Sequence, residues 1–386
     1  MEYVLLFTTL SICIFEKNKY KTLLTPFSVL FFPTCFLILI HKFFQFTQLN
    51  EIVLDSVNLI LVTEIIFFIV SLFMKDKKYI LKKETILKNK YIKIINILTL
   101  LMIIIRFFYD LQILGGLQNF EMLKLDRKNT IFSNFVEYFS VFIPVSLVSN
   151  KKSSRVVYFL YLLVQLLFQS KNRVFIVILQ GLFIIDLFYN VKLKKIIKSV
   201  ISIILLFFII YNLKGFSQKG IQLNIINHNI EILKHVYYYL ISPLINIENF
   251  HKTSEIYGNW KYFIIPIVEI LDKARIISRD SLGVFNFFEI GNGKTSNVGS
   301  IFGEMLYVNS TLLYGAFFIL LSLFSYYIYN RRNKNQYYAI LSSFLLAALA
   351  LSFFSNIFSL IFVWKRIFVV VVILLYRKMK KILARR

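Results

Sequence analysis

Long apolar runs separated by short polar stretches dominate the chain. Most of the runs are about 17 to 23 residues long, the length that an α-helix needs to cross the hydrocarbon core of a bilayer. No charge lies between Val4 and Phe15, and without a basic segment before this run or a small-residue cleavage site after it we expect no cleaved signal peptide. The pattern predicts eleven membrane spans, over residues 2–15, 24–41, 52–74, 92–109, 130–148, 156–170, 173–190, 196–213, 304–329, 337–354 and 357–376.

Composition agrees with this pattern and sets the fold class. The 386 residues are 58% hydrophobic with a mean hydropathy of +0.69, which excludes an ordinary soluble domain. We therefore expect an all-α, polytopic integral membrane protein forming a single domain over 1-386.

One long stretch, 214-303, interrupts the spans and is predicted to be a large extracytoplasmic loop. Its residues 222–241 follow the spacing of an amphipathic helix, and the apolar run 262–271 is too short to span and contains Pro266. A second amphipathic helix is predicted on the membrane surface over 110–129. Irregular polar backbone persists in a membrane protein only where water or protein covers it, so we expect the chemistry in 214–303.

The charges are distributed by loop. The net charge is +25, and alternate loops are strongly basic, which is the signature of cytoplasmic loops. This predicts an N-terminus outside the cell, a cytoplasmic C-terminus and an outward-facing long loop. The positive charge then anchors the protein at anionic membrane lipid, and nucleic acid is not expected as a partner. The basic loops are 16–23, 75–91, 149–155, 191–195, 330–336 and the tail after Tyr376.

Cysteine usage and glycine spacing exclude two kinds of site. Cys13 and Cys35 both lie in apolar runs, and without CxxC spacing or a Cys/His cluster we expect neither a disulfide framework nor a metal site. The segment GNGK at 291–294 lacks the spacing of a phosphate-binding P-loop, so we do not expect ATP binding.

Several charged residues lie inside predicted spans, where an unpaired charge is costly. Glu64 is about halfway along the third span, Glu137 lies in the fifth, and Lys365 and Arg366 are about nine residues from each end of the last. A Glu64–Arg366 ion pair is one interpretation. The other is a charged wall that lines a cavity for a lipid phosphate.

Residues 296–315, SNVGSIFGEMLYVNSTLLYG, carry a pattern that resembles bacterial oligosaccharide repeat unit polymerases, the Wzy-type O-antigen and capsule polymerases. A second point of similarity is Arg173, which follows the tight polar turn at 170–172 and opens a mid-chain helix. By itself Arg173 also fits an interfacial arginine that extends to lipid headgroups. The residues of the pattern are Gly303, Glu304, Tyr307, Asn309 and Gly315.

The resemblance implies a glycosyltransferase of GT-C-like architecture, without cofactors, in the bacterial inner (cytoplasmic) membrane. Its substrate would be an undecaprenyl-diphosphate-linked oligosaccharide, polymerised at the outer face of that membrane into O-antigen, capsule or exopolysaccharide. A flippase and a chain-length regulator would be its partner proteins.

Such a reaction needs cations for the diphosphate and a base for the acceptor hydroxyl. Arginine matches phosphate oxygens bidentately. If 275–279 is helical, Arg275 and Arg279 share one face. The candidate base Glu304 also fits a helix cap, and the other candidate base, His251, also fits an ordinary loop residue. The candidate diphosphate-binding residues are Arg173, Arg275, Arg279 and Arg106.

Two alternatives remain open at this point. An O-antigen ligase shares the predicted architecture but transfers the finished glycan to another acceptor. A lipid-linked oligosaccharide flippase belongs to a different class and predicts two similar halves, which the insertion at 214–303 argues against.

Overall fold

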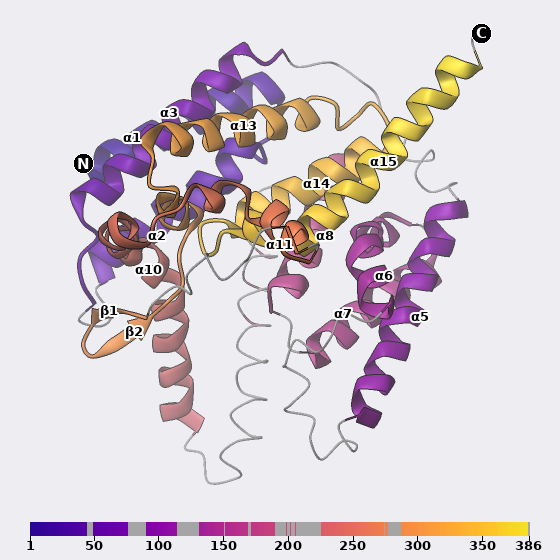
Figure 1. Cartoon of the computed structure of the whole chain (residues 1–386), viewed down its shortest axis with the longest axis horizontal. Helices are drawn as coiled ribbons and strands as arrows, with labels where there is room; N and C mark the ends of the chain where they lie inside the picture. The colour runs from indigo at the N-terminus through magenta and orange to yellow at the C-terminus, as the bar shows by residue number, and fades with distance from the viewer. Residues whose placement is uncertain are drawn as a thin grey trace. The chain divides into compact units, whose positions relative to one another are not determined.

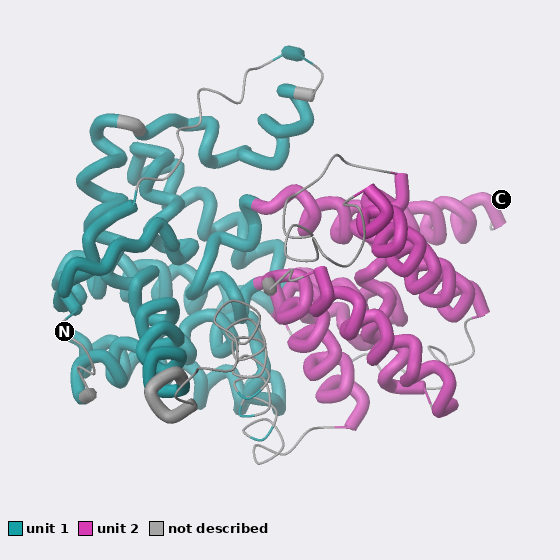
Figure 2. Tube along the Cα trace, turned by 90° about the horizontal axis from the view of Figure 1, so that it is seen from below, with its two compact units in different colours: residues 1–74, 192–326, 349–359 teal, residues 75–191, 327–348, 360–386 magenta. Residues whose placement is uncertain are grey.

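The computed structural model describes residues 1–44, 49–75, 90–113, 131–149, 151–168, 171–189, 198, 201, 205, 225–273, 275–276 and 287–384. These residues are almost entirely helical (Figure 1). The chain divides into two compact units, unit 1 with residues 1–74, 192–326 and 349–359, and unit 2 with residues 75–191, 327–348 and 360–386 (Figure 2). The expectation of a single domain over 1–386 stays a prediction.

Unit 1 carries the N-terminal helices and most of the segment predicted as the long loop. The helices α1, α2 and α3 pack on one another, and α10 packs on α2 and α3. Two short strands form an antiparallel hairpin beside α10. The elements are α1 (Glu2–Tyr20), α2 (Pro26–Phe44), α3 (Leu54–Phe73), α10 (Ile225–Tyr257), η4 (Trp260–Ile264), α11 (Ile265–Lys273), β1 (Phe288–Gly291), β2 (Lys294–Ser296), α12 (Ile301–Glu304), η6 (Met305–Val308), most of α13 (Thr311–Tyr329) and η7 (Ile357–Ser359).

Unit 2 is a bundle whose centre is the 3₁₀ segment η2, which packs against α5, α7 and α8. Pro144 lies inside η2 and cannot donate a backbone hydrogen bond, which is consistent with the change from α to 3₁₀ winding after Phe139. The elements are α5 (Lys90–Ile113), α6 (Ile131–Phe139), η2 (Ser140–Val148), α7 (Lys152–Leu167), α8 (Lys171–Tyr189), most of α14 (Gln336–Leu351) and α15 (Ile361–Leu383).

The helices support an all-α membrane protein. Six stretches in the described part of the chain are long and apolar enough to cross a membrane, and α14 is a shorter apolar helix. The predicted span 196–213 lies mostly outside the described residues, so the total of eleven stays a prediction. The six stretches are Pro26–Phe43, Leu54–Phe73, Lys90–Ile113, Ile131–Val148, Asn172–Tyr189 and Thr311–Tyr329.

The predicted span 304–329 is wrong as one continuous helix. The chain forms α12 and η6, then breaks at Asn309, whose φ of 51° lies in the left-handed region that Asn tolerates better than most residues. A new helix, α13, begins at Thr311, and the Ser310 hydroxyl accepts a hydrogen bond from the Leu313 amide at 3.3 Å, as an N-cap does. Glu304 therefore precedes the spanning helix by a full break in the chain.

Three features of 214–303 differ from the prediction or refine it. The predicted helix 222–241 is longer, because α10 continues through Pro243 to Tyr257. Pro266 falls in the first turn of α11, where its missing N–H costs no helical bond. The GNGK segment forms the β1–β2 turn, with Asn292 and Gly293 both at positive φ as a tight hairpin requires. This hairpin is the one sheet in the described residues of an otherwise helical fold.

Candidate functional site

Glu304 lies at the end of α12, which packs against α10 in unit 1. The Ser300 hydroxyl caps this helix by accepting from the Gly303 amide at 3.3 Å. A Cβ at Gly299 would lie 2.5 Å from the Phe250 ring and 2.7 Å from Glu304 Cγ. The absence of a side chain at Gly299 therefore lets the Phe250 ring and the Glu304 side chain lie against this loop.

The Glu304 carboxyl group is buried, with 8% of the residue exposed. Its Oε1 accepts from the Asn356 backbone amide at 3.5 Å, and no salt bridge to it forms among the described residues. Burial raises the pKa of Glu304 to about 8, because the charged form loses its hydration. A carboxyl group with a pKa this close to neutral can take up and release a proton under physiological conditions.

The residues that follow Glu304 in the sequence pattern also pack against α10. The Tyr307 ring lies 5.3 Å from Phe250, and its hydroxyl is 2.9 Å from Thr253 Oγ1 on α10. A Cβ at Gly258 would lie 2.3 Å from Asn309 Cβ. Gly303, Glu304, Tyr307 and Asn309 thus belong to one packed cluster at α10, whereas Gly315 lies in α13 with open space around it.

His251 is exposed on α10, although its neighbour Phe250 is fully buried against Gly299 and Gly303. No hydrogen bond joins the His251 ring to Glu304 in the described part of the chain. The two candidate bases therefore differ in environment, and the buried carboxyl group is the better suited to proton transfer.

A second group of charged side chains lies in unit 2, which we call the cation cluster: Glu137, Arg173, Lys365 and Arg366. Arg173 Nη2 donates to Glu137 Oε1 at 2.8 Å, and Lys365 Nζ donates to Glu137 Oε2 at 2.5 Å. Lys365 also donates to Asn134 Oδ1 at 2.8 Å. Two cations from α8 and α15 thus share a single carboxylate from α6.

Arg366, the fourth member, is fully buried. None of its guanidinium nitrogens has a hydrogen-bond partner among the described residues. Its Cζ lies 5.0 Å from the centroid of the Phe362 ring, and Arg173 Cζ lies 5.5 Å from the same centroid. The cluster therefore contains three cations and one carboxylate. A buried unpaired cation is unfavourable, so this arrangement favours an added anion.

Glu64 lies in unit 1 and Arg366 in unit 2, and the predicted ion pair between them stays a prediction. Within unit 1 the Glu64 carboxylate accepts from the Thr8 hydroxyl at 3.1 Å and from the Thr9 hydroxyl, and the Cys35 thiol lies 3.6 Å away. Lys365 and Arg366 lie in the first two turns of α15, because this helix begins at Ile361 and not at residue 357.

Two of the remaining predicted arginines, Arg106 and Arg275, lie in the described part of the chain. Arg106 pairs with Asp110 one turn later, at 3.3 Å, and its charge is neutralised there. Arg275 is exposed with a φ of 58°, so the helix predicted over 275–279 does not exist at this residue. Its amide bonds Asp272 O and that of Ile276 bonds Leu271 O, which is the Schellman ending of α11. Arg279 lies outside the described residues.

Glu137 is the site residue that sequence reasoning did not single out. The sequence does indicate a role for Glu137, because a carboxylate in a predicted span needs a partner. Three candidate cations, Arg173, Lys365 and Arg366, lie in other predicted spans. What the sequence lacked was the pairing, which joins positions 36 and 228 residues apart. No group of three or more His, Cys, Asp or Glu side chains that could hold a metal ion is found within the described ranges.

Comparisons of the chain with protein-family models, with curated proteins and with solved structures find no match.

Proposed function

We propose that the chain is an integral membrane glycosyltransferase that polymerises lipid-diphosphate-linked oligosaccharide repeat units, with GT-C-like architecture. The observation that carries the proposal is the cation cluster, in which Arg366 is buried without a hydrogen-bond partner beside Arg173 and Lys365. A diphosphate supplies the oxygens and the negative charge that the cluster lacks, and planar guanidinium groups bind such oxygens bidentately.

The proposed reaction needs two kinds of group, cations for the leaving diphosphate and a base for the acceptor hydroxyl. In the reaction an acceptor hydroxyl oxygen bonds to the anomeric carbon, the bond from that carbon to the lipid diphosphate breaks, and the hydroxyl proton passes to a base. The cation cluster stabilises the charge of the leaving diphosphate. Glu304, whose pKa is about 8, is the proposed base, and His251 is its replacement if Glu304 proves dispensable.

The membrane setting completes the proposal. The apolar helices support a membrane protein, and the basic loops favour an orientation with the long loop outside. The bacterial inner membrane is what the resemblance at 296–315 implies. We therefore assign the reaction to the outer face, with an undecaprenyl-diphosphate-linked oligosaccharide as substrate and with a flippase and a chain-length regulator as partner proteins.

The test is the glycan profile of cells that carry the Arg366→Lys variant or lack the protein. Loss of a polymerase leaves one repeat unit on each acceptor, whereas loss of a ligase or flippase leaves none. We expect single repeat units in both strains, because an ammonium group cannot reproduce the planar guanidinium fork. Arg377→Lys is the matched control, since Arg377 is exposed on the same helix. Long polymer from Arg366→Lys at normal protein level overturns the role of the cluster, and acceptors without any repeat unit in the deletion strain overturn the polymerase.

A further inference from the structure

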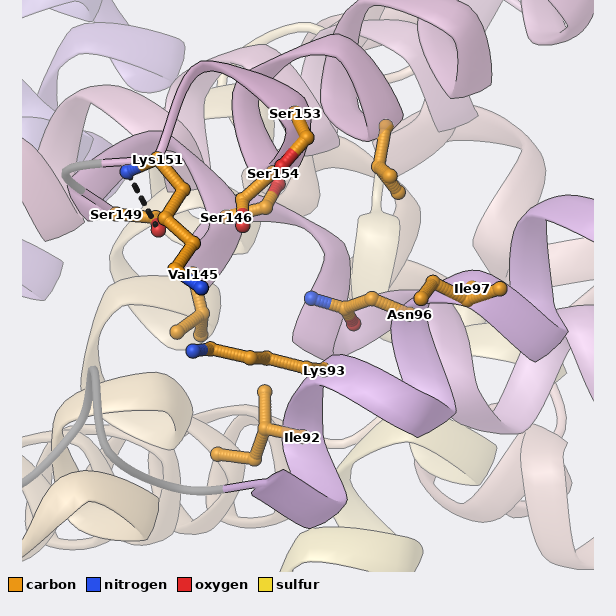
Figure 3. A pocket seen from close by; sticks show the side chains of 11 residues that line it. Ile92, Lys93, Asn96, Ile97, Val145, Ser146, Ser149, Lys151, Ser153 and Ser154 are labelled. Atoms are coloured by element: carbon orange, nitrogen blue, oxygen red, sulfur yellow. Dashed lines mark hydrogen bonds between the residues drawn. The ribbon is translucent and has the colours of Figure 1, made fainter.

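Polar side chains gather in different ways inside the two units. In unit 2 a hollow of about 310 Å³ lies between the start of α5 and the first turn of α7, and none of the described residues that line it is acidic (Figure 3). In unit 1 the polar side chains are closely packed among α1, α2, α3 and α13, and two of them, Glu16 and Glu64, are fully buried carboxyl groups. Buried carboxyl groups inside membrane helices are typical of proton-transfer paths.

Glu64 is surrounded by hydroxyl groups that can serve either of its protonation states. Thr8 Oγ1 lies 3.1 Å from Glu64 Oε2 and 2.8 Å from Leu5 O. Thr9 Oγ1 contacts Glu64 Oε1 and lies 2.7 Å from the same carbonyl oxygen. Each hydroxyl has one hydrogen to donate, so it bonds either the carboxyl group or the helix carbonyl. Glu64 can therefore gain or lose a proton while two hydroxyl groups rotate, and both states stay hydrogen-bonded.

Glu16 forms a second buried carboxyl site, near the end of α3. Its Oε1 accepts from the Tyr326 hydroxyl, whereas its Oε2 has no hydrogen-bond partner among the described residues. Ser71 Oγ lies close to this carboxyl group and is likewise buried without a hydrogen-bond partner in the described part of the chain. A buried acceptor without a partner is unfavourable, and a proton on Glu16 Oε2 supplies a hydrogen bond to Ser71 Oγ.

Neither carboxyl group forms a salt bridge within the described ranges. Lys19 is close enough to attract Glu16, but its ammonium group donates to the Ser71 carbonyl oxygen at the end of α3. An ionised carboxylate without a paired cation is costly in a membrane, so a proton is a suitable neutralising group. The other titratable side chains around the two carboxyl groups are thiols and phenols, which are mostly uncharged near neutral pH: Cys13, Cys35, Tyr20 and Tyr326.

The buried face of α1 connects the two sites. Thr9, Cys13 and Glu16 are spaced by four and three residues, so they lie on one face of the helix, and all three are buried. The Cys13 thiol is close enough to interact electrostatically with both Glu16 and Glu64. Thr9 and Glu16 are about 10 Å apart along the helix axis. Cys13 divides this distance into two shorter steps.

We propose that unit 1 contains a proton relay between Glu16 and Glu64. A proton leaves Glu16 Oε2 for Cys13 Sγ while the thiol hydrogen passes to Thr9 Oγ1, and the Thr9 hydroxyl hydrogen passes to Glu64 Oε1. Each connecting group gains one proton as it loses one, so the net change is the transfer of one proton between the two carboxyl groups.

The basic segment 16–23 begins at Glu16 and is expected on the cytoplasmic side, so we expect the relay to take up its protons there. The relay is separate from the proposed transferase chemistry and does not depend on it.

The experiment uses the full-length protein in lipid nanodiscs and infrared spectroscopy of the C=O stretch of protonated carboxyl groups. Glu64→Gln and Glu16→Gln assign the bands. The measured quantity is the rate at which the Glu64 band shifts after transfer from water to heavy water. Cys13→Val removes the transferable hydrogen, and Cys13→Ser keeps one. Ser11→Val is the matched control, because Ser11 is an exposed polar residue of the same helix.

We expect the Glu64 band to shift about tenfold more slowly, or slower still, in Cys13→Val and in Glu16→Gln, because protons transfer efficiently only between groups within hydrogen-bond reach. Cys13→Ser and Ser11→Val should keep the rate of the unchanged protein. If Cys13→Val does not fold, Glu16→Gln decides. The relay is overturned if Glu64→Gln removes no protonated-carboxyl band at neutral pH, if Glu16→Gln shifts as fast as the unchanged protein, or if Ser11→Val is slowed as much as Cys13→Val.

Discussion

Some charged side chains of this protein have a partner for their charge, and others do not. The Glu64 carboxylate accepts hydrogen bonds from two hydroxyl groups, and Arg106 forms an ion pair with Asp110. In the cation cluster, one carboxylate, Glu137, faces three cations. Folding stability alone does not favour a fully buried guanidinium without a hydrogen-bond partner, because contacts with the Phe344 and Phe362 rings and the attraction of Glu137 compensate only part of its desolvation. The imbalance is therefore the strongest residue-scale sign of ligand binding in the described part of the chain.

This imbalance predicts opposite stability effects for two substitutions in one cluster. Arg366→Met removes an uncompensated charge and keeps most of the volume, so we expect it to raise the free energy of unfolding by about 1 to 3 kcal/mol. Glu137→Gln leaves Arg173 and Lys365 unpaired as well and should lower it by about 3 kcal/mol. Thermal denaturation in matched detergent measures both. If Arg366→Met is the more destabilising of the two, the guanidinium is not unpaired.

The pKa of Glu304 predicts a pH dependence. The base is active when deprotonated, and a pKa of about 8 means that the deprotonated fraction, and with it the rate, rises with pH up to about pH 8 and then levels off. Glu304→Gln removes the ionisable group, so the rate should fall at least about a hundredfold, the usual contribution of a general base, and lose this rise. The measurement is the initial rate of polymer formation by purified protein between pH 6 and 9. A variant that keeps both rate and profile would transfer the role to His251.

At the scale of elements, the sequence predicts helices well and their interruptions poorly. Apolar periodicity places a helix near ten of the eleven predicted spans, and basic loops flank them. The break at Asn309 escapes prediction because a left-handed Asn inside an apolar run gives no strong local signal. At Pro243 the local signal is strong but misleading. Proline normally breaks a helix, yet α10 continues through Pro243 because it packs on α12 and η6.

The candidate site shows the same limit. The pattern at 303–309 indicated that Glu304 is special, and the resemblance singled out Arg173. The burial of Glu304 and the sharing of Glu137 by Arg173 and Lys365 depend on contacts between distant segments, which periodicity and spacing do not encode. The partners of Glu64 within unit 1, two hydroxyl groups of α1 and the Cys35 thiol of α2, are likewise contacts that charge matching along a sequence does not consider.

The close packing of α10 against the segment leading into α12 gives an element-scale prediction. Gly299→Ala places a Cβ 2.5 Å from the buried Phe250 ring and 2.7 Å from Glu304 Cγ, so α10 and α12 must separate. We expect a loss of about 1 to 3 kcal/mol in the free energy of unfolding, as for other overpacked sites. Gly315→Ala is the control, because open space surrounds it and alanine favours a helix. Equal melting temperatures for the two variants would count against this packing.

At the scale of the whole molecule, the +25 charge and the apolar segments follow one pattern, in which every second predicted loop between the apolar segments is basic. The net charge is concentrated in loops that alternate along the chain, while the long segment 214–303 is mixed in sign. Because Lys and Arg in short loops set orientation, this alternation predicts which ends of the helices share a compartment. It also decides whether the cluster around Glu304 can meet a substrate outside the cell.

The last prediction tests that orientation directly. A reporter that is active only in the cytoplasm is fused after Lys83, after Arg331 or after Asn259, with protein levels matched by immunoblot. The first two positions lie in basic segments, so we expect signal from them, and Asn259 lies between α10 and η4 in the segment predicted to face outward, so we expect none. A complementary reporter active only outside the cytoplasm should give the reverse result. Cytoplasmic signal from the Asn259 fusion would place Glu304 and its neighbours on α10 away from an external glycan, and the proposed polymerase would then lose its catalytic base along with its access to substrate.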